Sequence, residues 1–197
     1  HAAVDEDAPA SGGVGARGKK ISRGDVIQFS TQLAIMVETG VTLSEALDGA
    51  GKAYGTVFGA ILGTGAGGGI VFHGKLHEGP QHIGGEWGHN ILEPDGPPCY
   101  CGKRGCVETF LSGPGLAQDW RRHGGDPLFE AKDIVVLAEQ GDARAKAAMQ
   151  RYFDRFGRAL SVVINILDPD VIVLGGGMSN IPRLYTDGRD NVARYVF

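Results

Sequence analysis

The sequence of 197 residues predicts an α/β domain, and three features support that fold class. Two β-rich runs, TVFGAILGTG (56–65) and GGGIVFHGKL (67–76), are joined through glycine and predict a β-hairpin. A long segment at 142–167 repeats apolar residues at helical spacing, which predicts an amphipathic helix. The run PDVIVLGGG (169–177) is typical of a buried strand that ends in a glycine turn.

The part of the chain before the hairpin is expected to be a tail followed by two helices. Residues 1–20 are rich in Ala, Gly, Pro, Asp and Lys and lack apolar periodicity, which predicts a flexible tail. Residues 22–39 repeat apolar side chains near helical spacing, and Gly40 can end that helix. A second, shorter helix is expected at about 42–50.

The part after the hairpin is expected to be a long loop followed by three helices. Residues 80–106 are rich in Gly, Pro and Cys, and a loop of that length needs an additional cross-link to be ordered. Helices are expected at 107–118 and 131–140 and over the long segment already described, which Asp142 can cap. From Ser179 onward the chain is polar and suggests no further element.

The composition excludes several classes of protein. The net charge of −4 is spread without a block of like charges, which argues against nucleic acid or an anionic membrane as a partner. No apolar run approaches the roughly 18 residues of a membrane span, and the polar, acidic start is unlike a secretory signal. All three cysteines lie in one short segment, which fits a reducing cytoplasm better than a disulfide framework.

The segment CYCGKRGC (99–106) predicts a zinc site. Cys99, Cys101 and Cys106 can supply three thiolates, and structural zinc sites in cells commonly combine three cysteines with one histidine. His89 is the expected fourth ligand. The rival ligands are His82, which is the stronger one, and then His73 and His77. The alternative to zinc is a set of free thiols, or one disulfide with a spare thiol.

Two glycine-rich turns are candidate phosphate or nucleotide contacts. In LGTGAGGGI (62–70) successive backbone N–H groups and the Thr64 hydroxyl can hold a phosphate, although hairpin turns also use glycine. The turn LGGGM (174–178) suits close approach of a nucleotide, and it suits tight helix–strand packing equally well.

Two acidic residues flank the zinc segment. Glu86 lies three residues before His89, and Glu108 lies two residues after Cys106. Carboxylates beside an imidazole can bind the vicinal hydroxyls of a sugar. The alternative is that both are solvated charges of a loop.

Three stretches together resemble the ROK family of bacterial sugar kinases and related repressors. HIGGEWGHNILEPDGPPCYCGKRGCVETFLSGPGL (82–116) is similar to the signature of that family, and VFGAILGTGAGGGIVFHGKL (57–76) is similar to its phosphate-binding hairpin. DPDVIVLGGGMSNIPRLY (168–185) resembles its nucleotide-side strand. Within that family, the amino-acid sequence of the zinc segment most resembles the fructokinase or manno(fructo)kinase branch.

The resemblance implies the C-terminal lobe of an actin-like, ribonuclease H-like fold with a zinc-stapled loop, and an ATP- and Mg²⁺-dependent kinase that phosphorylates a hexose, here fructose. It also implies a homodimer. It assigns zinc to His89, Cys99, Cys101 and Cys106, and sugar hydroxyls to Glu86, His89 and Glu108. The nucleotide contacts that follow from it and from the glycine turns are Gly63, Thr64, Gly65, Gly67, Gly175, Gly176 and Gly177.

The sequence also departs from the pattern of the family. No DxGGT-like phosphate motif occurs in these 197 residues. Alignment on LSEA (43–46) places Val37 where the family has the Asp that acts as general base. Loss of a general base typically costs about 10²–10⁴ in rate, so the expectation is an inactive or nearly inactive chain.

The departures suggest a chain of mixed origin. Residues 20–48 resemble the first helices of a type II secretion F-family domain, and the family also continues past the final ARYVF. The expected organisation is therefore a tail at 1–20, a helical segment of different origin at 21–43 and a truncated kinase-like domain at 44–197. Two alternatives to a kinase fragment are a non-catalytic sugar-sensing domain and an interaction module of a secretion platform.

Overall fold

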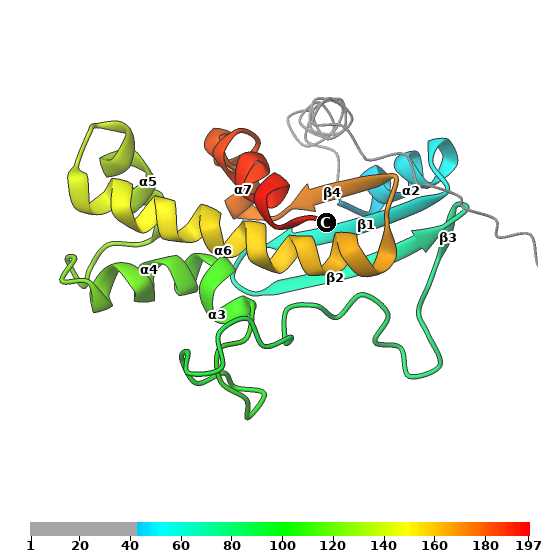
Figure 1. The fold of residues 1–197 in the computed structure, drawn as a ribbon, viewed down its shortest axis with the longest axis horizontal. Coiled ribbons are helices and arrows are strands. Elements are labelled where there is room, and N and C mark those ends of the chain that lie inside the picture. Colours follow the sequence, from blue (N-terminus) through cyan, green and yellow to red (C-terminus); the bar gives the residue numbers. More distant parts are fainter. Residues whose placement is uncertain (1–42) are drawn as a thin grey trace, which may run out of the picture.

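The computed structural model describes residues 43–197, which form a small mixed sheet and a group of helices (Figure 1). The predicted tail, the predicted helix at 22–39 and Val37 lie outside the described residues. The separate origin of residues 21–43 therefore stays a prediction.

The sheet has four strands in the order β3-β2-β1-β4. Strands β1 (Thr56–Leu62) and β2 (Ala66–Phe72) form the predicted antiparallel hairpin, and β3 (Lys75–Leu76) extends it at the edge. Strand β4 (Val171–Gly175) pairs with β1 in parallel and is buried throughout, which confirms the strand expected there. Because β1 and β4 are parallel, the hairpin turn after β1 and the C-terminal end of β4 lie at the same end of the strands.

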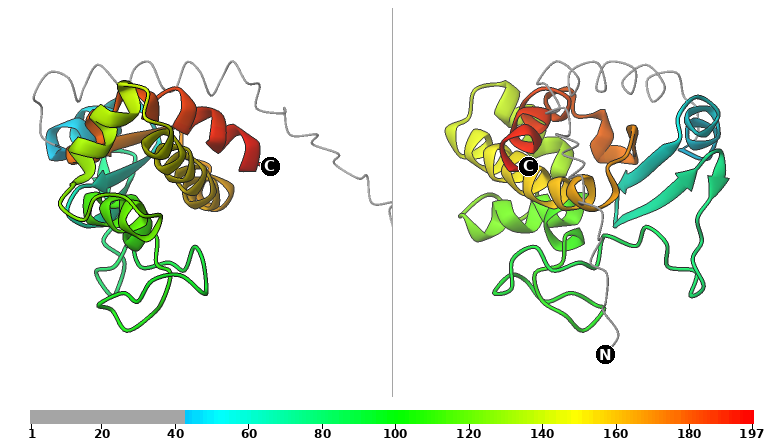
Figure 2. Two further views of the ribbon diagram at one scale, coloured as in Figure 1. Left: turned by 90° about the vertical axis from the view of Figure 1, so that its left-hand side faces the viewer. Right: turned by 45° about the vertical axis from the view of Figure 1, so that its right-hand side comes forward.

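Helix α2 (Leu43–Ala53) covers one side of the sheet and corresponds to the helix expected at about 42–50. Its close approach depends on Gly59 in β1, because a Cβ atom there would lie 2.8 Å from the side chain of Leu47. On the opposite side, the irregular segment between β3 and α3 extends away from the sheet (Figure 2). This segment contains all three cysteines.

The helix expected at 107–118 is two helices, α3 (Glu108–Leu111) and α4 (Gly113–Arg122). The break falls at Ser112, whose backbone is extended and whose hydroxyl accepts a hydrogen bond from the N–H of Gly115. Serine before a first turn that contains proline is a strong N-cap signal, and it overrides the continuous helical pattern. Helix α5 (Ala131–Glu139) follows as expected.

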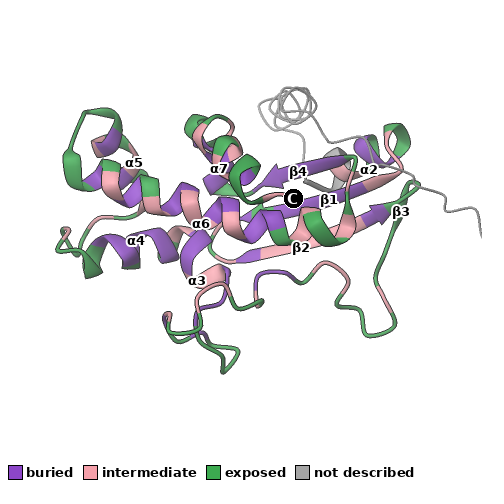
Figure 3. Ribbon diagram, viewed as in Figure 1, coloured by how far each residue is buried: buried purple, intermediate pink, exposed green. Residues whose placement is uncertain are grey.

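Helix α6 (Ala143–Leu167) is the longest element and was predicted with nearly its observed ends. The Asp142 side chain caps it by accepting a hydrogen bond from the N–H of Ala145. Its apolar face is buried from Ala145 to Ser161 (Figure 3). The hydroxyl of Tyr152 donates to the backbone carbonyl of Leu111, which attaches α3 to α6.

The polar C-terminal stretch contains elements that the sequence did not suggest. Two short 3-10 helices, η1 (Gly177–Asn180) and η2 (Pro182–Leu184), lead into helix α7 (Asp187–Tyr195). Only Gly188 and Val192 of α7 are buried, so its apolar stripe is too narrow to stand out in the sequence. None of the helices in residues 43–197 has the length and hydrophobicity of a membrane span.

Candidate functional site

The irregular segment before α3 is held against the sheet by Trp87. Its indole ring is buried, meets the Phe58 ring edge-on at 5.7 Å and donates from Nε1 to the carbonyl of Gly67. The two ends of the cysteine-containing part are then tied together, because the carbonyl of Gly105 accepts from the N–H groups of Leu92 and Glu93. The segment is thus ordered although it has almost no regular secondary structure.

Four of the predicted metal ligands lie together in this segment. The side-chain ligand atoms of His89, Cys99, Cys101 and Cys106 all lie within 4.8 Å of one another. Nδ1 of His89 is 3.6 Å from Sγ of Cys99, and the Sγ atoms of Cys101 and Cys106 are 3.7 Å apart. The rival ligand His82 is directed elsewhere, to the Glu78 carboxylate, and neither His73 nor His77 belongs to the cluster.

The pKa values of Cys101 and Cys106 are shifted in opposite directions. Burial, followed by the hydrogen bonds and charges of the other two cysteines, raises the pKa of Cys106 to about 12. A hydrogen bond from the Lys103 backbone is the main cause of a lowered pKa at Cys101. One imidazole and three sulfur atoms at these separations fit a tetrahedral Zn²⁺ ion, which favours such donors and keeps bound thiols ionised.

Of the predicted sugar-binding residues, His89 belongs to this cluster, and Glu108 lies close to it because its N–H donates to the carbonyl of Gly88. Glu108 lies at the start of α3, and its carboxylate accepts a hydrogen bond from the N–H of Ala66 at 3.0 Å. Glu86 is exposed. The charges of Glu108 and, to a smaller extent, Glu86 raise the pKa of Tyr100, whose hydroxyl is 3.0 Å from Nε2 of His89. The structure therefore brings Glu86, His89 and Glu108 to one region.

Only some of the candidate nucleotide-binding residues line a cavity. Gly63 and Thr64 of the hairpin turn and Gly177 after β4 line a cavity of about 820 Å³. Gly65 instead faces Glu108, since a Cβ atom there would lie 2.6 Å from Oε2 of that residue. The remaining candidates, which do not line the cavity, are Gly67, Gly175 and Gly176.

Most of the cavity lining comes from residues that sequence reasoning did not single out. Helices α4 and α5 supply two cations, Arg121 and Lys132, together with the apolar side chains of Val135 and Val136. The N–H of Gly113, at the start of α4, donates to the carbonyl of Gly63 at 2.8 Å. The signal for these residues was weak because their spacing is that of any amphipathic helix.

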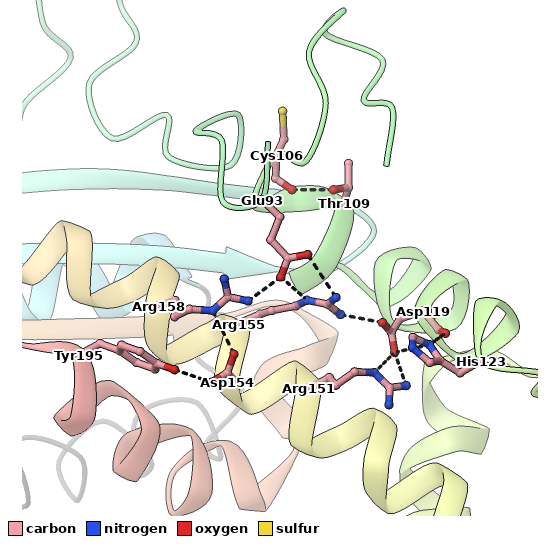
Figure 4. Close-up of polar contacts among 10 residues, drawn as sticks. All are labelled: Glu93, Cys106, Thr109, Asp119, His123, Arg151, Asp154, Arg155, Arg158 and Tyr195. Carbon is pink, nitrogen blue, oxygen red and sulfur yellow. Dashed lines mark hydrogen bonds and ion pairs between the residues drawn. The ribbon is translucent and has the colours of Figure 1, made fainter. Parts of the chain in front are cut away.

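A partly buried network of ion pairs connects the cysteine-containing segment to the helices (Figure 4). The guanidinium of Arg155 in α6 donates to Glu93 at 2.9 and 3.3 Å and to Asp119 of α4 at 2.7 Å. Arg158 also donates to Glu93, and Arg151 makes two hydrogen bonds to Asp119. Arg155 thus joins the segment that carries the cysteines to helix α4, which forms part of the cavity wall.

The network predicts that acid destabilises the fold. Burial opposes ionisation of Asp119 and Glu93, but the bonds and charges of their arginine partners outweigh it and lower both pKa values from 3.8 and 4.5. A lowered folded-state pKa adds stability that is present above the unfolded-state value and lost as the pH falls below it. We expect urea midpoints to fall steeply from about pH 5 to pH 3, since ordinary carboxyls titrate near pH 4.

The variant Asp119→Asn provides the control for this prediction. It cannot ionise at residue 119, so its urea midpoint should fall less over the same pH range. Equal pH dependence in the variant and the wild type would contradict the role assigned to Asp119.

The comparisons with known proteins all indicate the same family. The sequence model of the ROK family matches residues 25–197. That match includes most of the segment at 21–43 for which a different origin was expected. An N-acetyl-D-glucosamine kinase of Escherichia coli is 40% identical over an alignment of 164 residues that covers 78% of this chain and 54% of that protein. This chain therefore spans about half the length of such curated relatives.

Solved structures agree with the sequence comparison. A ROK hexokinase from Thermus thermophilus has a TM-score of 0.70 and 32% identity, covering 78% of this chain and 53% of its own. A ROK family glucokinase from Streptomyces griseus, in complex with glucose and AMPPNP, has a TM-score of 0.68 and 28% identity. The match covers 77% of this chain and 56% of the glucokinase. These similarities confirm the α/β, actin-like kinase fold.

Proposed function

This chain belongs to the ROK family, and on that premise we propose that it forms the lobe of an ATP-dependent sugar kinase that carries the metal loop. The reaction would transfer the γ-phosphoryl group of ATP, with Mg²⁺, to a hydroxyl of a hexose. Phosphoryl transfer depends mainly on positioning and on charge stabilisation. The proposal therefore concerns which residues of this lobe position which substrate.

The sugar would bind to Glu86, His89 and Glu108. Two carboxylates accept hydrogen bonds from sugar hydroxyls, and an imidazole nitrogen that does not bind metal can supply a donor. Zn²⁺ at His89, Cys99, Cys101 and Cys106 would serve as a structural ion that fixes the loop. Its binding free energy, about 10–16 kcal/mol in small zinc domains, is enough to order such a segment.

The nucleotide would occupy the cavity that Gly63, Thr64 and Gly177 line. The hairpin turn offers backbone N–H groups, and the start of α4 adds the positive end of a helix dipole. Arg121 adds positive charge, whereas the ammonium group of Lys132 lies 3.5 Å from the carboxylate of Glu130, which also lines the cavity. The other candidate glycines would act indirectly, by allowing the backbone turns next to this cavity. They are Gly65, Gly67, Gly175 and Gly176.

The observation that carries the proposal is the hydrogen bond between the Glu108 carboxylate and the N–H of Ala66. It ties a sugar-binding carboxylate to the turn whose other residues, Gly63 and Thr64, line the cavity. A sugar held by Glu108 would therefore lie next to the phosphates of a nucleotide in that cavity. This is the arrangement that transfer of a phosphoryl group requires.

The catalytic base is the part of the proposal that this chain does not supply. Val37 occupies the position where the family resemblance places an Asp, and its side chain cannot accept a proton. We expect turnover far below 1 s⁻¹, at the low end of ordinary enzymes. A coupled assay for ADP release that gives about 1 s⁻¹ or more would contradict this expectation.

The preferred hexose is a further part of the proposal. The resemblance of the zinc segment to the fructokinase branch favours fructose. The relatives reported above are instead an N-acetyl-D-glucosamine kinase, a hexokinase and a glucokinase. Fructose specificity therefore stays a prediction. We also expect a homodimer, which the family resemblance favours, in the cytoplasm, which the clustering of all three cysteines in one short segment favours.

Calorimetric titration tests the proposal and its alternatives. The zinc-loaded chain would be titrated with AMPPNP and with N-acetylglucosamine, glucose, mannose and fructose. A kinase lobe binds the nucleotide and one sugar, a sugar-sensing domain binds sugar alone, and a secretion-platform module binds neither. Glu108→Gln serves as the matched variant, and we expect its sugar affinity to fall about tenfold, since hydrogen bonds to charged groups contribute about 1.5–3 kcal/mol.

A further inference from the structure

Tyr100 is an exposed aromatic residue in contact with the metal-binding histidine. Its side chain stands at the surface with a relative exposure of 85%. Its ring nevertheless meets the His89 ring edge-on, with centroids 5.1 Å apart and an angle of 87° between the planes. Its hydroxyl lies 3.0 Å from Nε2 of the same histidine. Two specific contacts thus hold a side chain that solvent surrounds.

The two nitrogens of His89 have different partners. Nδ1 faces the cysteine cluster at 3.6 Å from Sγ of Cys99, and Nε2 faces Tyr100. A neutral imidazole carries one proton, so a metal ion on Nδ1 requires that Nε2 carries it. In the metal-loaded protein, Nε2–H therefore donates to the hydroxyl oxygen of Tyr100. A hydrogen bond to the second nitrogen of a ligand histidine fixes the orientation of the ring.

The same N–H group is the one available to a sugar. Nδ1 of His89 faces Cys99, so Nε2 is the ring nitrogen left for a sugar, and the Tyr100 hydroxyl lies 3.0 Å from it. A sugar hydroxyl that accepts from Nε2–H would need the position that the Tyr100 oxygen occupies.

We propose that Tyr100 is a positioning residue that occupies Nε2 of His89 until a sugar hydroxyl displaces it. The inference rests on the proposed function, because it assumes that sugar binds at His89. Displacement is inexpensive, since the high exposure of Tyr100 lets its hydroxyl bond to water instead. The residue has two opposite effects: it supports metal binding and it competes with sugar.

The test compares Tyr100→Phe with wild type and with Tyr195→Phe. The control also loses one hydroxyl hydrogen bond, from Tyr195 to Asp154, but it lies on α7 outside the cluster. Zinc affinity is measured by competition with a chromophoric chelator, and sugar affinity by calorimetry at saturating zinc with the sugar that the wild type binds best.

Two shifts of opposite sign are expected in Tyr100→Phe alone. Zinc affinity should fall about tenfold, the lower end for a partner of a metal-bound histidine. Sugar affinity should rise about two- to tenfold, the range that one hydrogen bond contributes. An unchanged zinc or sugar affinity in Tyr100→Phe, or equal shifts in Tyr195→Phe, would overturn the inference. If all three proteins bind zinc but no sugar, the proposed function fails as well.

Discussion

Replacing Cys106 with serine is expected to weaken zinc binding by more than about 100-fold, since second-shell changes alone cost about 10–100-fold. Cys106 is fully buried, and a serine hydroxyl there is a poor substitute for a thiolate ligand. The loss should also loosen the segment from Gly88 to Cys106, because the four ligand side chains that the metal would hold together all lie in it. Metal content after dialysis and amide hydrogen exchange across this segment measure both effects.

His82→Gln is the control for the metal site. It removes the rival histidine, which in this structure contacts Glu78 and lies outside the cluster. We expect its zinc content and hydrogen exchange to equal those of the wild type. Zinc retained by Cys106→Ser, or lost by His82→Gln, would mean that the ligand set is wrong.

Replacing Arg155 with methionine is expected to lower the free energy of unfolding by about 3 kcal/mol, the lower end for breaking a buried ion pair. The exposed fraction is 14% for the Arg155 side chain, 5% for Asp119 and 29% for Glu93, so water has little access to the Asp119 carboxylate once this partner is lost. The loss is limited because Arg151 still pairs with Asp119 and Arg158 with Glu93.

Urea unfolding and thermal melting measure this effect, and a decrease in Tm of roughly 10 °C is expected for a domain of this size. Arg189→Met is the matched control, because Arg189 pairs with the exposed carboxylate of Asp190. Surface pairs of that kind contribute about 0–1 kcal/mol. Equal destabilisation by the two variants would show that the buried network has no special role.

The sequence predicted the elements whose signals are local. The hairpin, the buried strand β4 and the long helix α6 have clear apolar periods and clear end signals, such as the Asp142 cap. The break at Ser112 could also have been predicted, because a serine cap and a following proline are visible in SGPG. Helix α7 could not, since its buried stripe contains only one apolar side chain larger than glycine.

The candidate site was predictable only where its residues are close in the chain. His89 and the three cysteines lie within 18 consecutive residues and do form one cluster. The network of Glu93, Asp119 and Arg155 joins residues that lie 26 to 62 positions apart, and the cavity lining combines residues from Gly63 to Ile181. No spacing rule links such residues, because the fold alone brings a loop, α4 and α6 together.

If a metal bound by the His/Cys₃ cluster builds the sugar site of this lobe, sugar binding must depend on zinc. Calorimetric titration with sugar, of the same preparation in zinc-loaded and zinc-stripped form, measures this dependence. We expect the loaded protein to bind one sugar per chain, stripping to abolish binding and added zinc to restore it. Equal sugar affinity in the two forms would mean that the cluster does not build the site.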